Sequence, residues 1–225
     1  MIIIKKQIIF SLLFILGILF SFGIFITKTY ATKSNKTFYI YIDPGHGGFD
    51  GGCEDKLKTV VEKDITLNIS LLLASYLRSS GYVVNLTRQT DTALANTKKD
   101  DIYKRVDLIN NSNANIYISI HANSYPSNSV KGAQVFYSNI NSNNKMISEV
   151  VMKKIKMIDS LNKREPLCIK NKYLLDNVKT TGCLIEVGFL TNEIDLSNLT
   201  NNEYIADLVK CIYLGIVEYL DYLKR

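Results

Sequence analysis

Both histidines of the chain follow apolar runs, in segments whose other residues are mostly small or polar. His46 lies in the glycine-rich stretch "YIDPGHGGFDGG", and His121 lies in "SIHANS". Two carboxylates are also candidates. Glu62 lies at the first turn of a predicted helix, and Glu186 lies in the apolar run "LIEVGF". Two imidazoles and one carboxylate, with a fourth position open, form a ligand set of catalytic zinc hydrolases. The imidazoles favour zinc over calcium and magnesium, which prefer oxygen ligands.

Each of these residues also has a purely structural explanation. His46 alone could cap a turn, and His121 could be a buried polar group with a satisfied partner. Glu62 could be an acid at a helix N-terminus, where the helix dipole favours it. Glu186 resists such an explanation, because an unpaired charge buried in an apolar strand is costly. The four residues together are therefore more specific than any one of them.

The hydrophobic pattern indicates the elements that must position these residues. Apolar runs predict strands, and apolar residues three and four positions apart predict helices. The predicted strands cover residues 37–43, 82–87, 115–120, 133–138, 172–175 and 183–189, and the predicted helices cover about 62–81, 102–109, 146–158 and the stretch from 202. This alternation predicts a three-layer α/β/α fold around a mostly parallel or mixed central sheet of about six strands. Sites in such sheets gather beyond the carboxyl ends of the strands, so the four candidates are predicted to share one rim.

Composition excludes two other classes of protein. Hydrophobic residues make up 47% of the chain, which is enough for one well-buried core and argues against disorder. The net charge of +6 comes largely from the first 36 residues, which hold five lysines and no acid. Since the whole chain has 27 basic and 21 acidic residues, 22 basic and 21 acidic residues remain after that segment. They form no basic block interleaved with aromatic residues, so we expect no nucleic-acid partner.

The N-terminus carries a targeting signal. Residues 8–26 contain no charge and follow two lysines, which is typical of a segment that enters a membrane as a helix. The length of this segment slightly favours a retained anchor, although "TYA", which ends at Ala31, resembles a cleavage site. We therefore predict a signal peptide or membrane anchor at residues 1–31, containing a hydrophobic helix, and one catalytic domain at residues 37–225. That domain is expected to be exported and to act outside the cytoplasm.

Nucleophilic catalysis by a serine or a cysteine is the main rival chemistry. Ser119 and Cys183 could serve as nucleophiles, but the chain has no G-x-S-x-G turn, and each histidine is better explained as a metal ligand. The four cysteines form no C-x-x-C pair, so neither a zinc ribbon nor a thioredoxin motif is present. They could form disulfides in an exported protein, but buried or incidental thiols are the preferred interpretation.

Four motifs, in order, resemble those of the zinc-dependent N-acetylmuramoyl-L-alanine amidases of the amidase-3 family. They are "IDPGHGG", the glutamate at the start of the next helix, "ISIHAN" and "LIEVGFLTN", and the resemblance covers about residues 38–222. It implies that His46, Glu62 and His121 hold one Zn²⁺ per chain. It also implies that Glu186 is the catalytic glutamate. The implied reaction is hydrolysis of the amide that joins N-acetylmuramic acid to L-alanine in peptidoglycan.

The glycines around His46 have two interpretations under this resemblance. Five glycines would let a bulky glycan strand approach the metal without obstruction by side chains. The alternative is a purely conformational role, since glycine adopts backbone angles that other residues avoid.

Within this family, the build of the chain is most similar to that of the germination-specific spore-cortex amidases. The chain has one hydrophobic N-terminal segment and no cell-wall-binding repeats. This similarity implies removal of stem peptides during cortex maturation, which prepares muramic acid for δ-lactam formation.

The chain departs from the family pattern in two places. Thr181 lies near the position where the family commonly has a proline, which concerns the shape of a loop. Only eight residues, "SYPSNSVK", separate "HAN" from the next predicted strand, so there is no room for the inhibitory helix of some relatives. Any control must therefore come from expression, location, metal loading or an accessory protein that acts on activity or on zinc loading.

The metal site alone does not choose the substrate. Another zinc peptidase, or a deacetylase that acts on the cell wall, is the nearest alternative function. A non-catalytic, membrane-tethered module that binds the wall is a second alternative, which the presence of all four candidate residues disfavours.

Overall fold

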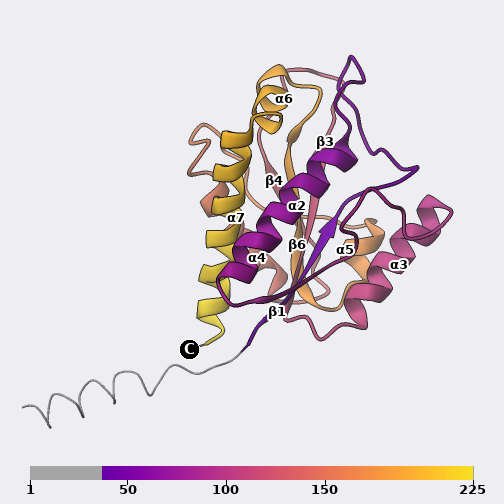
Figure 1. Ribbon diagram of the computed structural model, residues 1–225. Coiled ribbons are helices and arrows are strands. Elements are labelled where there is room, and N and C mark those ends of the chain that lie inside the picture. The colour runs from indigo at the N-terminus through magenta and orange to yellow at the C-terminus, as the bar shows by residue number, and fades with distance from the viewer. Residues whose placement is uncertain (1–36, 225) are drawn as a thin grey trace, which may run out of the picture. The chain divides into compact units, whose positions relative to one another are not determined.

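The apolar runs of the sequence form the strands of one sheet in the computed structural model, which describes residues 37–224 (Figure 1). The strands are β1 (Tyr39–Pro44), β2 (Val83–Leu86), β3 (Ile116–Asn123), β4 (Gln134–Tyr137), β5 (Leu167–Cys168) and β6 (Thr181–Phe189). Their order across the sheet is β2-β1-β3-β6-β4-β5. β4 and β6 pair antiparallel, and all other neighbours pair parallel. The prediction of a mixed, six-stranded sheet is confirmed.

Successive residues of a strand point to opposite faces of the sheet, and both faces here carry apolar side chains. Helices therefore cover both faces. The helices are α2 (Glu62–Ser79), α3 (Lys98–Asn110), α4 (Asn144–Ile155), α5 (Tyr173–Asn177), α6 (Glu193–Leu199) and α7 (Asn202–Tyr222). One apolar cluster joins α2, α4 and α7 to the face that carries Ile42, Ile118 and Ile185. A smaller cluster joins α3 and α5 to the face that carries Tyr117 and Leu184. The arrangement has the three layers that the sequence predicts.

The helices next to the candidate residues begin at contacts that the sequence supplies. Thr97 caps α3, since its Oγ1 accepts a hydrogen bond from Asp100 N at 3.1 Å. α2 has no side-chain cap, and Glu62 N donates instead to the carbonyl oxygen of Cys53 at 2.8 Å. The start of α2 is therefore tied to the loop that precedes it, which fixes the position of Glu62.

Short elements differ from the sequence prediction. The run "KYLL" was expected to be a strand, but α5 occupies this place, and Val178 N donates to Leu174 O at 3.0 Å as in a helical turn. Periodicity cannot assign so short an apolar run. A helical turn buries the adjacent Leu174 and Leu175 together, whereas a strand would point them to opposite faces. The sixth strand is β5 instead, and the sequence prediction also lacks α6.

The predicted N-terminal targeting segment, residues 1–31 with the apolar stretch 8–26, lies outside the described residues. Within residues 37–224, no helix combines the length and the apolar character that a membrane span requires.

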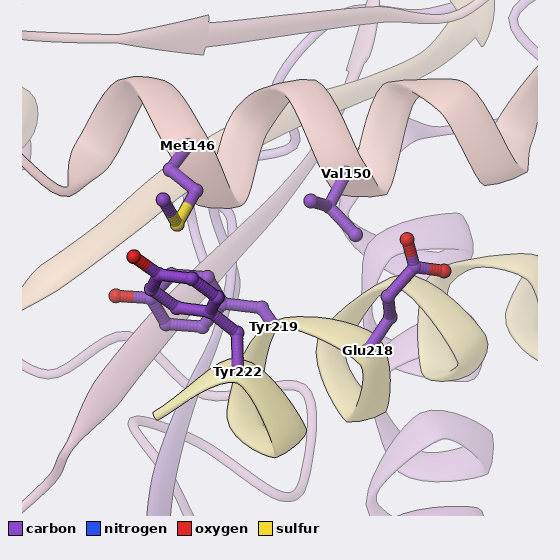
Figure 2. A pocket seen from close by; sticks show the side chains of 5 residues that line it. All are labelled: Met146, Val150, Glu218, Tyr219 and Tyr222. Carbon is purple, nitrogen blue, oxygen red and sulfur yellow. The ribbon is translucent and has the colours of Figure 1, made fainter. Parts of the chain in front are cut away.

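The two ends of the described chain meet at the amino end of β1. Lys224 Nζ lies 5.7 Å from the centroid of the Phe38 ring, one residue before that strand. A cavity of about 300 Å³ lies near this end, between α4 and α7 (Figure 2). Its lining consists of Met146, Val150, Glu218, Tyr219 and Tyr222. It contains no histidine or cysteine, and Glu218 pairs with Lys154 Nζ at 2.6 Å, so we assign it no chemistry.

Candidate metal centre

β1 delivers His46 to the rim of the sheet through a tight loop. The strand ends at Pro44, and His46 has a φ of 62°, in the left-handed region that few side chains adopt. Gly47 N donates to Asp50 O at 2.9 Å, and Asp50 N donates back to Gly47 O at 3.1 Å. This reciprocal pair closes the loop, so the backbone that carries the imidazole is held in place.

Two glycines of this loop make room for the other candidate residues. A Cβ atom on Gly45 would overlap the imidazole ring of His121. A Cβ atom on Gly52 would overlap the carboxylate of Glu62. These glycines face the protein and not an open path for substrate, so their contacts favour the conformational interpretation over the approach of a glycan strand.

The two histidines and Glu62 converge on one point. His46 Nε2 lies 3.1 Å from Glu62 Oε1, and His121 Nδ1 lies 3.0 Å from the same oxygen. The imidazole centroids are 5.0 Å apart, with the rings 81° from coplanar. One ligand atom from each of the three residues lies within 4.8 Å of the others. The sequence predicts that His121 follows a strand ending at residue 120. β3 instead runs on to Asn123, so His121 lies inside the strand.

Backbone donors fix the carboxylate of Glu62. Its Oε1 accepts a hydrogen bond from Ala122 N at 3.0 Å, and its Oε2 accepts one from Cys53 N at 2.8 Å. Burial by itself would raise the pKa of Glu62, but hydrogen bonds from His121 and His46 outweigh burial and hold the pKa well below its usual range. The carboxylate is therefore ionised and offers negative charge to the point where the imidazoles meet.

The same charges act on His46. Burial alone would lower the pKa of His46, but the carboxylates of Glu62 and Asp50 outweigh burial and raise it. The cluster therefore attracts positive charge. A proton on the imidazole and a metal ion compete for the same ring nitrogen.

Glu186 lies beside His121, because the register of β3 and β6 pairs these two residues. The residue is half-buried, but its Oε2 is shielded from water and has no hydrogen-bond partner within residues 37–224. Burial raises the pKa of Glu186; the His121 imidazole opposes this rise and the Glu62 carboxylate adds to it. Buried polar atoms of native proteins are normally paired, so this orphaned oxygen indicates a role beyond packing.

The three donors fit a zinc ion. Tetrahedral zinc with ligands at about 2.0–2.1 Å places neighbouring ligand atoms roughly 3.4 Å apart. The two histidine nitrogens lie 3.1 and 3.0 Å from the Glu62 oxygen, close to that spacing. Imidazole donors also select against calcium and magnesium. The structure thus brings together all four residues that the sequence singles out, and three of them could hold the metal.

Two buried arginines hold the backbone of the His46 loop, and neither was anticipated from the sequence. Arg105 donates through Nη1 to Pro44 O and through Nη2 to His46 O, both at 2.6 Å. Arg88 Nη2 donates to the carbonyl oxygen between them, that of Gly45, at 2.8 Å. Three successive carbonyl groups therefore accept hydrogen bonds from guanidinium groups, which positions the imidazole through the main chain.

Asp43, fully buried at the end of β1, anchors Arg105. Its Oδ1 accepts from Arg105 Nη1 at 2.8 Å and from Thr87 Oγ1 at 2.7 Å. Burial would raise the pKa of Asp43, but Arg105 and hydroxyl donors outweigh it and lower the pKa. The sequence signal for this pair is an aspartate at the end of an apolar strand. Its partner lies 62 positions away, and nothing in the sequence links the two residues.

The rival nucleophiles are not placed for catalysis. Ser119 is fully buried, and its hydroxyl donates to Asp43 Oδ2 at 2.8 Å. Cys183 is fully buried, and burial raises its pKa to about 12, so the thiol stays protonated. All four cysteines are free thiols, which agrees with the interpretation as buried or incidental residues.

The part of the chain that contains the four candidate residues is similar to known proteins of one family. The family model described as N-acetylmuramoyl-L-alanine amidase, amidase-3, matches residues 40–218, which include all four candidates. The germination-specific N-acetylmuramoyl-L-alanine amidase of Bacillus subtilis (strain 168) is 38% identical over 188 residues, covering 80% of this chain and 78% of that relative. The N-acetylmuramoyl-L-alanine amidase LytC of the same organism is 29% identical over 184 residues, covering 80% of this chain but 35% of LytC.

A solved structure shows the same fold. The CwlD amidase from Clostridioides difficile, in complex with the GerS lipoprotein, matches with a TM-score of 0.79 and 36% sequence identity. The match covers 83% of this chain and 100% of that chain.

Proposed function

The chain belongs to the amidase-3 family of N-acetylmuramoyl-L-alanine amidases and is an amidase of peptidoglycan, and we propose that it works with one Zn²⁺ held by His46, Glu62 and His121. The bond cleaved is the amide between N-acetylmuramic acid and L-alanine. The observation that carries the proposal is the convergence of three ligand atoms beside the unpartnered carboxylate oxygen of Glu186. When bound, zinc supplies a water of pKa about 7 and polarises the substrate carbonyl.

Glu186 is the group that moves the proton in this proposal. Its Oε2 has no partner within the described residues, and burial raises its pKa above the ordinary value, which favours acceptance of a proton. It takes a proton from the attacking water and delivers it to the alanine nitrogen, which leaves as an amine. Arg105 and Arg88 hold the loop of His46, so the imidazole is oriented before substrate arrives.

The proposed biological setting is the spore cortex. Support comes from the germination-specific relative of Bacillus subtilis, which the chain matches over most of both lengths. Removal of stem peptides there would leave peptide-free muramic acid, the form required for δ-lactam formation. The enzyme would act outside the cytoplasm after export through residues 1–31, with residues 8–26 as a signal or anchor.

An accessory protein is part of the proposal. The similar CwlD amidase was solved in complex with a lipoprotein. We propose that this chain also binds a partner protein, and that this partner controls its activity or its zinc loading.

Digestion of peptidoglycan tests the reaction. Purified protein is incubated with cortex peptidoglycan and the products are identified by mass spectrometry, with the His121→Ala variant as control. An amidase yields free stem peptides that begin with L-alanine, together with peptide-free muramic acid. Shortened stem peptides would indicate a peptidase instead, and loss of acetyl groups would indicate a deacetylase. A chelator should stop the reaction and added zinc should restore it, whereas inhibition only by a thiol reagent would contradict the metal chemistry.

A further inference from the structure

We infer that Asp50 is a positioning residue, which fixes the His46 imidazole in the tautomer that offers Nε2 to the metal. The inference rests on the zinc site of the proposed function. It concerns a residue outside the ligand set and outside the group that moves the proton.

The contact of Asp50 with the imidazole is direct. Asp50 Oδ2 lies 2.7 Å from Nδ1 of His46, and the residues are four positions apart in the same loop. A carboxylate only accepts hydrogen bonds, so Nδ1 must carry the proton. Nε2 lies 3.1 Å from Glu62 Oε1, and there a metal ion would take the place of a second proton, so the neutral ring offers its lone pair from Nε2.

Asp50 is itself held from two sides. Its Oδ1 accepts from Lys98 Nζ at 2.6 Å, at the first residue of α3. Its main chain is bonded in both directions to Gly47, next to His46. The main-chain bonds fix the position from which the side chain extends, and rotation of the carboxylate away from the ring would break its ion pair with Lys98. α3 therefore reaches the imidazole through Lys98.

The second histidine has no equivalent support. His121 presents Nδ1, not Nε2, to Glu62, at 3.0 Å. Within residues 37–224 no hydrogen bond joins the other ring nitrogen of His121 to a carboxylate, and the strand β3 itself holds that residue. The two ligands are thus oriented by different means, His46 by a carboxylate on its ring and His121 by its place in the sheet.

This difference predicts a selective effect on metal affinity. Carboxylates that orient a ligating histidine typically contribute about 10- to 100-fold to metal affinity. We expect Asp50→Ala to weaken zinc binding by about that factor. Asp50→Asn should weaken binding less than Asp50→Ala does, because the amide oxygen still accepts from Nδ1 but carries no charge.

Competition with a chelating dye measures the zinc affinity of each full-length protein. Asp91→Ala is the matched control, since Asp91 Oδ1 accepts from Gly48 N at 2.7 Å in the same loop but does not touch the ring. Asp91 also pairs with Lys63, so both variants remove one ion pair of similar kind. The melting temperature of each metal-free variant shows whether the fold is intact. We expect similar melting temperatures for the two variants and weakened zinc binding only for Asp50→Ala.

The tautomer of His46 can be measured, and it would not change if Asp50 had only a structural role. The chain has two histidines, so ¹⁵N-histidine labelling with a His121→Ala variant assigns the ring signals. Zinc-loaded wild type should show His46 with a protonated Nδ1 and a metal-bound Nε2, and Asp50→Ala should show loss or mixing of that state. Wild-type zinc affinity in Asp50→Ala, or the same loss in Asp91→Ala, would overturn the inference while leaving the zinc site in place. Absence of zinc binding in the wild type would overturn the inference and the metal part of the proposed function together.

Discussion

The two faces of the central sheet are built from different kinds of residue. The face covered by α2, α4 and α7 carries the larger apolar cluster, with Ile42, Ile118 and Ile185 buried among helix residues. The face covered by α3 and α5 has a smaller apolar cluster and buries a charged pair, Asp43 and Arg105. Because strand residues alternate, the apolar side chains of one face and the polar side chains of the other come from the same strands.

This difference indicates that the two faces contribute differently: one mainly to the stability of the fold, the other mainly to the positions of the candidate site residues. Tyr117, Ser119 and His121 alternate with the apolar-face residues of β3. Along this side of the strand a packed ring is followed by a buried hydroxyl that is hydrogen-bonded to Asp43, and then by a candidate metal ligand. On β6, Leu184 and Glu186 follow the same path. The apolar face supplies burial, and the polar face sets the positions of the groups that do chemistry.

The largest expected effect is a loss of turnover when Glu186, on the polar face, is replaced. Glu186→Gln keeps the size of the side chain but removes its ability to take a proton, so turnover should fall by about 10²- to 10⁴-fold. Zinc content should be unchanged. The melting temperature should not fall, because the substitution removes a buried charge whose Oε2 has no partner in the described part of the protein.

Three measurements on one preparation test that expectation. Metal analysis, thermal melting and turnover of Glu186→Gln are compared with the wild type. Parallel loss of zinc, stability and rate would show that Glu186 is a structural residue, and near-normal turnover would remove it from the mechanism.

Loss of the buried ion pair should affect stability and metal binding together. Arg105→Met leaves Asp43 without its charged partner in a site that is fully buried, which should cost about 3–5 kcal/mol of unfolding free energy. It also removes the donor to the His46 carbonyl, so zinc affinity should fall as well.

A substitution on the apolar face is the control for that effect. Leu73→Ala removes a fully buried side chain of α2 and should cost about 2–5 kcal/mol. Denaturant titration and zinc competition are measured for both variants. The contrast between the faces fails if Leu73→Ala weakens zinc binding as much as Arg105→Met does.

The pH dependence of the melting temperature should show the same difference between the two faces, with a smaller effect. Folding lowers the pKa of Asp43, since Arg105 and the hydroxyl donors Thr87 and Ser119 together outweigh burial. This carboxylate therefore contributes stability above its unfolded pKa of about 3.9, and the contribution disappears as the pH falls through the folded pKa. The melting temperature of the metal-free wild type should therefore fall below about pH 4. Arg105→Met should show a shallower fall, and Leu73→Ala should keep the wild-type slope. Equal slopes in all three proteins would contradict the assignment.

The smallest expected effect is a gain. The hydroxyl of Tyr117 is buried on the α3 face and has no hydrogen-bond partner among the described residues. Tyr117→Phe removes this unpaired group and keeps the ring, so we expect stability to rise by about 1 kcal/mol with zinc affinity unchanged. Denaturant titration measures the change, and a clear loss of stability would show that the hydroxyl has a partner in solution.

Sequence reasoning succeeded where the signal was local. The strand before His46 and the long helices α2 and α7 follow from apolar runs and periodicity, and the predicted start of one helix at Glu62 is confirmed. The four candidates could be chosen from local sequence, because the two histidines follow apolar runs, Glu62 begins a helix and Glu186 interrupts an apolar run.

The failures involve short or distant relations. Four apolar residues at α5 fit a strand or a helix equally well, and only the packing of Leu174 and Leu175 decides between them. The pairing of Asp43 with Arg105 joins positions far apart in the chain, so no window of sequence contains both. The candidate site residues could thus be chosen from the sequence, whereas the residues that hold them in place required the folded structure.

The meeting of the two described ends has a practical consequence. Phe38 and Lys224 are neighbours at the amino end of β1, whereas His46 follows the carboxyl end of that strand. A short Gly/Ser linker could therefore join residues 37 and 224, and new termini could be opened in the exposed loop around Ser80, which precedes the amino end of β2. The resulting circular permutant would keep every strand pairing and leave the rim that carries His46 and His121 unobstructed. The domain is thus suited to insertion into a host protein or to attachment to a solid support through one short stem.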